Sequence, residues 1–384
     1  MNTKPEKLND LPSRLPHRVA VVLAAIVFPL IWVGGLVTTY DAGMSVPDWP
    51  GTYGYNMFLY PIEWWLSGPF DLFVEHGHRL LGSLAGLVAI ALVFVTVRNE
   101  PRGWVKWFSV ALLVLVIAQG VLGGMRVRLD ARTLAKIHGC VGPAFFASVA
   151  GFIVVTSRWW YRRSLDRVLE ISSGQRDSGK IGYGLIFFST LMLAASFGQL
   201  VVGAFLRHID IASPANIYRG LVVLHITIAM LLVLGTFVQW FFSHLPRFKG
   251  AGIRGSINIL MLLVLTQVML GAGTWVVKFG WPVWFAKESF AASFVVGEKT
   301  FFQMNLITAH VAVGSLILAF WTVHMLRCRC SIGSRAVDLV DSVVGSDRQD
   351  SANDVSDPPS SEFAAPDQST EENNLSPHPL TTSG

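Results

Sequence analysis

Eight long apolar stretches dominate this sequence and determine what it can fold into. They lie near residues 19–39, 74–97, 105–125, 134–156, 182–206, 219–242, 256–277 and 304–326. Because a helix rises about 1.5 Å per residue, each stretch is long enough to cross the hydrocarbon layer of a bilayer. The chain is 52% hydrophobic and only 14% charged, which excludes a soluble protein of this length. We therefore expect an all-α polytopic membrane protein with eight transmembrane helices.

Basic residues cluster beside alternate spans and predict the orientation. Four lie within residues 1–18, six within 157–181 and three within 243–255, whereas the long segment 40–73 has none. The positive-inside rule then places both termini in the cytoplasm and residues 40–73 outside. The net charge of +5 reflects this topology, so no nucleic-acid partner is expected. The first span lacks a convincing cleavage site, which favours a retained helix in a bacterial plasma membrane.

One predicted external loop departs from that rule, because it is basic. It carries Arg126, Arg128, Arg132 and Lys136. Such bases could hold an anionic ligand group such as a propionate. A solvated loop, or contact with lipid headgroups, explains them equally well.

An internal repeat divides the chain into two similar halves. The pattern Gln-x3-Gly occurs in spans three, five and seven, at Gln119, Gln199 and Gln267, and span one has Ile31-x3-Gly35. Each occurrence precedes an external loop and then a helix with an early histidine. We expect two pseudo-symmetric four-helix bundles, residues 19–156 and 182–326, because small residues at this spacing let helices pack closely. Residues 1–18 form a cytoplasmic arm and residues 333–384 a disordered cytoplasmic tail, since the tail is rich in Ser, Asp, Pro, Asn and Glu.

Four histidines lie near the starts of the even-numbered spans: His78, His138, His225 and His310. Helices of alternating direction bring these starts to the same side of the membrane. Histidine inside a bilayer is costly and usually functional. Two pairs at matched depth suit the axial ligation of heme iron, with one heme in each bundle. The alternative is a set of hydrogen-bonding residues such as a proton relay.

The segment EHGHRLLG, residues 75–82, places Glu75 and His78 three residues apart on one helical face. Beside a heme, that carboxylate is free for acid–base work or for stabilising positive charge. A di-iron carboxylate site would need further inward carboxylates, which the later spans lack. His76 is interpreted as an interfacial polar residue, and His324 as a residue without a partner. Cys140 is expected to be a packed thiol, and Cys328 and Cys330 to follow the last helix.

These motifs together resemble one known family. The run GMSVPDWP at 43–50, the EHGHRLLG segment and the early histidines of spans four, six and eight are similar to the heme A synthase family, over roughly residues 19–326. The resemblance implies two four-helix bundles and the oxidation of a porphyrin methyl group of heme O to a formyl group, giving heme A for terminal oxidase assembly. It further implies that the catalytic residues are Glu75, His78 and His138, with both histidines facing the substrate heme. His225 and His310 would hold a heme B that relays electrons.

The implied partners are heme O, membrane lipid, heme O synthase and a membrane electron donor. Some family members carry a cysteine pair in an external loop, and this chain lacks it. Two other functions are compatible with four paired histidines: a di-heme b-type electron carrier, and a heme carrier or assembly factor. Glu75 argues against a pure electron carrier, which has no need for a carboxylate on a ligand's helical face.

Overall fold

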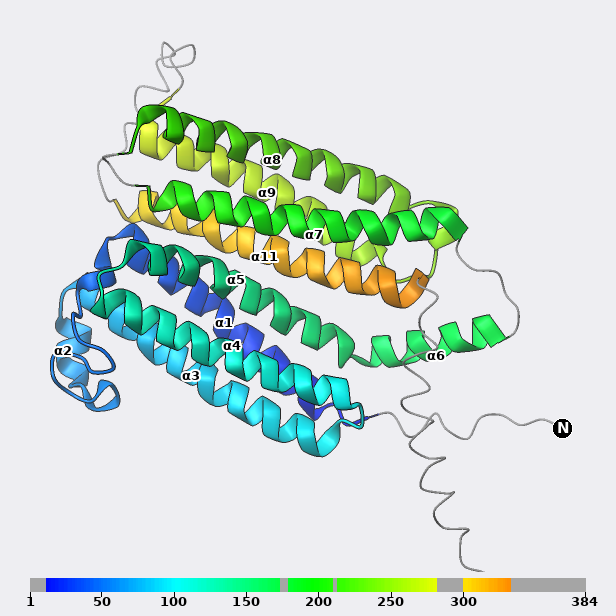
Figure 1. Ribbon diagram of the computed structural model, residues 1–384, viewed down its shortest axis with the longest axis horizontal. Helices are drawn as coiled ribbons and strands as arrows, with labels where there is room; N and C mark the ends of the chain where they lie inside the picture. The colour runs from blue at the N-terminus through cyan, green and yellow to red at the C-terminus, as the bar shows by residue number, and fades with distance from the viewer. Residues whose placement is uncertain (1–11, 173–178, 210–212, 282–299, 333–384) are drawn as a thin grey trace, which may run out of the picture. The chain divides into compact units, whose positions relative to one another are not determined.

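The computed structural model describes residues 12–172, 179–209, 213–281 and 300–332. Within these ranges eight helices are long and apolar enough to cross a membrane, as the sequence predicted. They are α1 Leu15–Thr39, α3 Phe70–Asn99, α4 Gly103–Arg128, α5 Arg132–Val155, α7 Gly179–Arg207, α8 Ala215–Ser243, α9 Arg254–Phe279 and α11 Phe301–Ile332 (Figure 1). The predicted tail 333–384 and most of the predicted arm lie outside the described residues.

The outward faces of these helices are apolar, which suits lipid contact. Leu87 of α3 is 62% exposed, Phe187 of α7 is 71% exposed and Met269 of α9 is 73% exposed. A helix that is apolar all round is found in a membrane rather than on the surface of a soluble protein. The exposed side chains are therefore the surface that a bilayer would cover.

The first four long helices pack around small residues. α1 contacts α3 and α5, and α4 contacts α3 and α5. Ala20 of α1 and Ala85 and Ala89 of α3 are almost fully buried, next to Leu23 and Leu92. Because their side chains are small, the backbones of α1 and α3 can approach closely.

The last four long helices show the same pattern of neighbours. α7 contacts α8 and α11, and α9 contacts α8 and α11. Their core is formed by residues such as Leu232, Ile257, Leu260 and the fully buried Trp321. α11 also contacts α5 and α1, so the two sets share an extensive interface (Figure 1).

Several shorter elements were not expected from the sequence. α2 (Ile62–Ser67) and the 3-10 turns η2 (Ala42–Met44) and η3 (Met57–Leu59) lie in the segment between α1 and α3. α6 (Arg158–Ser172) lies in the predicted cytoplasmic loop, and η4 (Pro246–Phe248) follows α8. These elements are short or polar, so a search for long apolar stretches misses them.

Two helix boundaries correct the sequence analysis. α1 begins at Leu15, so the last residues of the predicted arm are helical, and His17 Nδ1 lies 3.0 Å from the carbonyl oxygen of Ile153 in α5. α11 extends to Ile332, so Cys328 and Cys330 are buried inside this helix instead of following it. Both ends are stabilised by packing against other helices, which local sequence does not reveal.

Candidate functional site

Two pairs of histidines face each other near the starts of their helices. His78 of α3 lies opposite His138 of α5, with ring centroids 6.3 Å apart. His225 of α8 lies opposite His310 of α11, with ring centroids 6.4 Å apart. The structure thus brings together the histidines that belong to the same repeat, in two pairs with nearly equal separations.

Each of these imidazoles rests against a glycine in the preceding long helix. A Cβ atom built on Gly34 would lie 2.7 Å from Cε1 of His78, and one on Gly123 would lie 3.2 Å from Cε1 of His138. In the other half, a Cβ atom on Gly203 would lie 3.4 Å from Cε1 of His225, and one on Gly271 would lie 3.1 Å from Cε1 of His310. In every case Cε1 is the nearest ring atom and Nδ1 the next, so Nε2 is the nitrogen farther from the glycine. The glycines therefore set the position of the rings, because a side chain there would push the imidazole away.

The glycine of α1 differs from the sequence expectation. The repeat was placed at Gly35, but Gly34 lies against His78, and a Cβ on Gly35 would instead lie 2.8 Å from Thr308 of α11. The two neighbouring glycines thus serve two contacts. Because α1 lacks the glutamine that marks the repeat in the other helices, the sequence alone did not show which of the two glycines is equivalent to Gly123, Gly203 and Gly271.

The paired rings fit the axial ligation of a heme. A bond between a metal ion and an imidazole nitrogen is about 2 Å long, and the nitrogen lies about 1.2 Å from the ring centre, so two imidazoles on opposite sides of one ion have centroids about 6.4 Å apart. Both pairs match this separation. In each ring Nε2 is the nitrogen farther from the supporting glycine, so Nε2 rather than Nδ1 is the atom available to a metal ion.

A metal site built from protein ligands alone fits less well. Among the described residues, no group of three or more His, Cys, Asp or Glu side chains that could hold a metal ion occurs. A di-iron carboxylate site needs several inward carboxylates, which disagrees with this arrangement. A heme brings four ligands of its own, so two imidazoles suffice for each iron.

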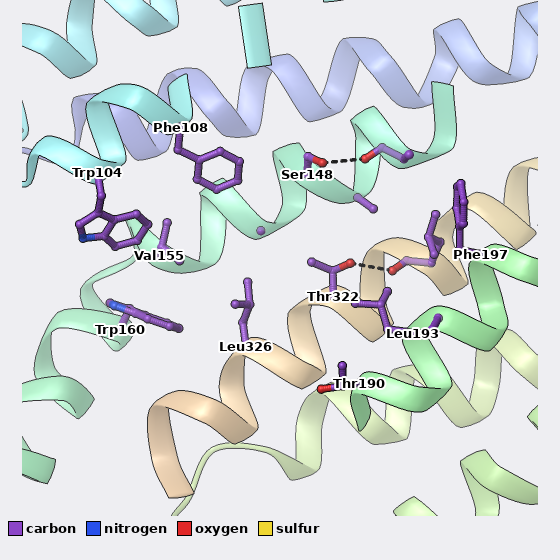
Figure 2. A pocket seen from close by; sticks show the side chains of 15 residues that line it. Trp104, Phe108, Ser148, Val155, Trp160, Thr190, Leu193, Phe197, Thr322 and Leu326 are labelled. Atoms are coloured by element: carbon purple, nitrogen blue, oxygen red, sulfur yellow. Dashed lines mark hydrogen bonds between the residues drawn. The ribbon is translucent and has the colours of Figure 1, made fainter. Parts of the chain in front are cut away.

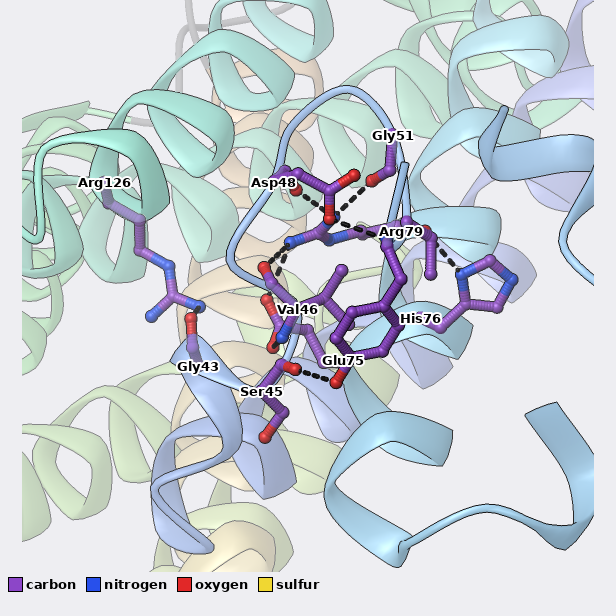
Figure 3. Close-up of polar contacts among 11 residues, drawn as sticks. Gly43, Ser45, Val46, Asp48, Gly51, Glu75, His76, Arg79 and Arg126 are labelled. Atoms are coloured by element: carbon purple, nitrogen blue, oxygen red, sulfur yellow. Dashed lines mark hydrogen bonds and ion pairs between the residues drawn. The ribbon is translucent and has the colours of Figure 1, made fainter. Parts of the chain in front are cut away.

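Glu75 is nearly fully buried, with 2% of its surface exposed. One carboxylate oxygen accepts a hydrogen bond of 2.9 Å from Arg79, and the other accepts one of 2.8 Å from the backbone amide of Val46 (Figure 3). Each carboxylate oxygen therefore has a donor. Glu75 was predicted on the helical face of His78; in the structure its hydrogen bonds are with Arg79 and with the segment between α1 and α3.

The guanidinium of Arg79 fastens that segment to α3. It donates to the carbonyl oxygens of Val46 and Asp48, both at 2.7 Å, and of Gly51, at 2.8 Å (Figure 3). These acceptors lie in or directly after the run GMSVPDWP. The motif is therefore a loop whose backbone carbonyls wrap one buried arginine.

His76 takes part in the same attachment. It is 2% exposed, and its Nδ1 lies 3.0 Å from the hydroxyl of Thr52. Its ring packs between Tyr60 and Trp65, at centroid distances of 5.2 and 5.3 Å. His76 was interpreted as an interfacial polar residue; the structure shows in addition that aromatic side chains of the loop and α2 bury it. The many aromatic residues between positions 53 and 65 were the feature of the sequence that could have indicated this burial.

The loop also reaches α4. Trp49 lies directly against the backbone of Gly124, where a Cβ would overlap its indole. Arg126 donates to the carbonyl oxygen of Gly43 at 3.3 Å (Figure 3). The run 43–50 therefore joins the start of α3, which carries His78, to the end of α4, which carries the glycine beneath His138.

The predicted basic loop separates into two groups. Arg128 and Arg132 are exposed, as a solvated loop would be. Arg126 and Lys136 are half-buried, and Lys136 Nζ lies 5.0 Å from the ring centroid of Phe205 in α7. Sequence reasoning missed a further cation, Arg207 at the end of α7.

Arg207 connects α7 to α1. It donates to the carbonyl oxygen of Gly35 at 2.6 Å and to the hydroxyl of Thr39. The charge of Arg207 also affects the neighbouring His208. Burial, together with the charges of Arg207, Arg126 and Lys136, lowers the pKa of His208 from 6.5 to about 4. The helix ends near the histidine pairs thus carry several positive charges. In the sequence, Arg207 could have been identified as a basic residue at the end of an apolar stretch.

His324 has partners that the sequence did not reveal. It is fully buried; Gln239 of α8 donates to its Nε2 at 3.0 Å, and its Nδ1 lies 2.9 Å from the hydroxyl of Ser256 in α9. The Sγ of Cys328 lies 3.5 Å from the same Nε2. Because the amide nitrogen of Gln239 is a donor only, His324 Nε2 accepts and Nδ1 carries the hydrogen. The partners lie far away in sequence, on other helices, which is why they were missed.

An apolar cavity of about 720 Å³ lies between α4, α5, α6, α7 and α11 (Figure 2). Trp104 and Trp160 line it, and none of the paired histidines does. Its hydroxyls are engaged within their own helices: Ser148 donates to Ala144 at 2.8 Å and Thr322 to Leu318 at 3.1 Å. The cavity therefore offers hydrocarbon surface rather than groups for chemistry.

Comparison with known proteins gives a consistent result. The sequence model of the COX15-CtaA family, described as cytochrome oxidase assembly protein, matches residues 17–219. A heme A synthase of Cereibacter sphaeroides is 27% identical over 364 residues, covering 77% of this chain and 88% of the relative. A heme A synthase of Beijerinckia indica is 28% identical over 315 residues, covering 68% of this chain and 84% of the relative.

Proposed function

Because the chain belongs to the COX15-CtaA family of cytochrome oxidase assembly proteins, and is an enzyme of heme A biosynthesis, we propose that it oxidises one methyl group of heme O to a formyl group. Two successive two-electron oxidations would take the methyl group to an alcohol and then to a hydrated aldehyde. In each step water would supply the oxygen atom, two protons would be released, and two electrons would pass one at a time to a one-electron acceptor outside this chain. Loss of water from the hydrate gives the formyl group of heme A.

The two histidine pairs have different roles in this proposal. His78 and His138 hold the substrate heme in the half formed by α1, α3, α4 and α5. His225 and His310 hold a heme B in the half formed by α7, α8, α9 and α11. Held by these two histidines, a heme B would supply one-electron redox chemistry for electrons that leave the substrate. The observation that carries the proposal is the pair of centroid separations, 6.3 and 6.4 Å, which suit one iron in each half.

Glu75 is the proposed acid–base or charge-stabilising group. It lies one helical turn from His78, in a buried setting where electrostatic interactions are strong. Loss of electrons from the porphyrin edge builds positive charge, and a buried carboxylate nearby stabilises it. The contacts with Arg79 and Val46 hold this carboxylate in place.

The basic helix ends supply a counterpart for the carboxylates of a heme. Arg126 lies in the last turn of α4, Lys136 lies near the start of α5, and Arg207 ends α7. Anionic propionates would bind there through charge-assisted hydrogen bonds. With the cytoplasmic side assigned from the distribution of basic residues, both sites lie towards the outer face of a bacterial plasma membrane.

The proposed reaction is tested by expressing the chain in a host that makes heme O but no heme A. Chromatography of the hemes extracted from the purified protein then gives a clear outcome. Heme O together with heme A means turnover, and heme B alone means an electron carrier or an assembly factor without this activity. Absence of heme A from a well-expressed, heme-loaded protein would reject the proposed reaction.

A further inference from the structure

Glutamine side chains hold the backbone of two of the paired histidines. Gln119 of α4 donates to the carbonyl oxygen of His138 at 3.1 Å, and Gln199 of α7 donates to that of His225 at 2.9 Å. Each glutamine precedes by four residues the glycine that supports the same imidazole. One Gln-x3-Gly motif thus touches a histidine twice, at its carbonyl oxygen and at its ring.

The third glutamine occupies the equivalent place. Gln267 Nε2 would lie 3.3 Å from a Cβ on Gly314, and Gln119 Nε2 would lie 3.3 Å from a Cβ on Gly142. These two glycines each follow their histidine, His310 or His138, by four residues. Gln267 therefore stands beside the turn that begins with His310, as Gln119 stands beside the turn that begins with His138.

The fourth position breaks the pattern. The residue four positions before Gly34 is Leu30, whose side chain cannot donate a hydrogen bond. The helix of His78 is attached instead through Glu75 and Arg79 to the external loop. His78 is thus the one member of the four that has no glutamine at the repeat position.

We propose that Gln119, Gln199 and Gln267 are positioning residues for the heme ligands, and that Leu30 makes His78 the ligand that releases. The inference rests on the proposed function and deepens it. A resident heme must stay bound, whereas a substrate heme must enter and its product must leave. In the half formed by α7, α8, α9 and α11, a glutamine occupies the repeat position for both histidines, Gln199 for His225 and Gln267 for His310. In the other half, only His138 has a glutamine at that position.

The expected size of the effect follows from other metal sites. Removal of a group that orients a metal-bound histidine typically lowers metal affinity about 10- to 100-fold. A glutamine that holds the carbonyl oxygen of a histidine fixes the position and rotation of that helical turn, and so orients the imidazole. Its loss should therefore accelerate heme release, and its introduction at position 30 should slow it.

The test measures heme release from each half separately, in the purified full chain. In a His78→Ala background heme is held by the second pair only, and in a His225→Ala background by the first pair only. Transfer of heme to an excess of apomyoglobin, followed by absorbance, gives the release rate. We expect Gln199→Met to accelerate release from the second pair about tenfold, and Leu30→Gln to slow release from the first pair about tenfold.

Gln303 provides a matched control. It donates across helices to the carbonyl oxygen of Val277 at 2.7 Å, but it lies two turns away from His310. Gln303→Met removes an interhelical hydrogen bond of the same kind and should leave heme release unchanged. The absorption spectrum reports independently whether the iron remains low-spin with two imidazoles.

The outcomes separate this inference from the proposed function. A wild-type chain that holds no heme at the two pairs would contradict the proposed function itself. If the wild type holds both hemes, but Gln199→Met and Leu30→Gln alter release no more than Gln303→Met does, the positioning role is overturned and the proposed reaction is unaffected. Should Gln199→Met fail to fold, Leu30→Gln and Gln267→Met decide the question.

Discussion

Glu75 and Arg79 form a buried ion pair of 2.9 Å across one turn of α3. Neither group is isolated, since Val46 donates to the carboxylate and also accepts from the guanidinium. Breaking a buried pair by removing one partner is strongly destabilising, because it leaves an uncompensated charge. The pair therefore fixes the loop between α1 and α3 over the start of α3, next to His78.

The first prediction separates the charge of Glu75 from its role in holding the loop. Glu75→Gln keeps the shape and an acceptor for the Val46 amide but removes the negative charge. We expect the substrate heme to bind and the yield of heme A to fall at least ~10²-fold, as is typical of acid–base and electrostatic contributions. Heme O and heme A retained by the variant are measured by chromatography.

Arg79→Met is the matched comparison for this variant. It removes the donor to the loop carbonyls while leaving the carboxylate, so it should lower the thermal stability of the protein more than Glu75→Gln does. Near-normal heme A in a folded Glu75→Gln variant would remove Glu75 from the mechanism and leave it as a loop anchor.

The second prediction tests the assignment of one heme to each histidine pair. His225→Ala or His310→Ala should remove the b-type low-spin spectrum, because a five-coordinate iron is held less firmly. His78→Ala or His138→Ala should abolish heme A formation and leave heme B bound. Absorption spectra and heme extraction check both statements, and loss of both hemes in every folded variant would contradict the two-site arrangement.

The sequence predicted the parts of this fold that depend on length and periodicity. Eight apolar stretches of about 20 residues correspond to eight helices because a bilayer demands helices of that length. The repeat assigned two of the four histidines to each half, and the structure places the two histidines of each half opposite each other. It could not locate Gly34, because α1 has Leu30 where the other helices have a glutamine.

Contacts between distant segments were beyond reach of the sequence. The attachment of residues 43–51 to Arg79 joins backbone carbonyls, which no residue pattern encodes. The partners of His324 come from α8 and α9, and only the packing of helices brings them together. Sequence periodicity identifies the faces of helices but not which face of a neighbour each one meets.

The third prediction concerns the glycines beneath the imidazoles. A Cβ on Gly34 would come within 2.7 Å of His78, whereas one on Gly203 would lie 3.4 Å from His225, an ordinary contact. Gly34→Ala should therefore displace His78 and lower heme A formation at least tenfold, in the range of losses from disturbed ligand positioning. Gly203→Ala should retain heme B.

Gly82 supplies the control for this series. It lies one turn after His78, and a Cβ there would meet nothing within 4 Å. Gly82→Ala should leave both heme content and product unchanged. If Gly34→Ala behaves like Gly82→Ala, the close fit between α1 and His78 does not govern the site.

The fourth prediction is a pH dependence at the basic helix ends. The pKa of His208 is lowered to about 4 by burial and by the nearby charges of Arg207, Arg126 and Lys136. The unfolded chain then binds a proton more readily than the folded one, so stability should fall as the pH drops from 6.5 towards 4. Unfolding temperatures in detergent between pH 7.5 and about 5 measure it, with a shallower slope expected for His208→Asn. Equal slopes for both proteins would assign the pH dependence to other groups.

The last prediction concerns the buried polar contacts of His324. His324 follows His310 by fourteen residues and Gln239 follows His225 by fourteen, while the corresponding positions of the first half are Phe152 and Leu92, both fully buried. The same place is thus polar in one half and apolar in the other. His324→Phe leaves Gln239 without one of its acceptors and should lower the free energy of unfolding by about 1–3 kcal/mol.

Replacing both partners should be less harmful than replacing one. The double variant His324→Phe with Gln239→Leu copies the residues of the first half and removes the amide donor together with its imidazole acceptor. Apolar replacement of both members of a buried pair can be nearly neutral, so we expect it to recover most of the lost stability. A double-mutant cycle of unfolding in detergent measures the coupling, which should be favourable by at least ~0.5 kcal/mol. Additive losses would mean that His324 and Gln239 stabilise the helices independently, and that the hydrogen bond of 3.0 Å between them contributes nothing of its own.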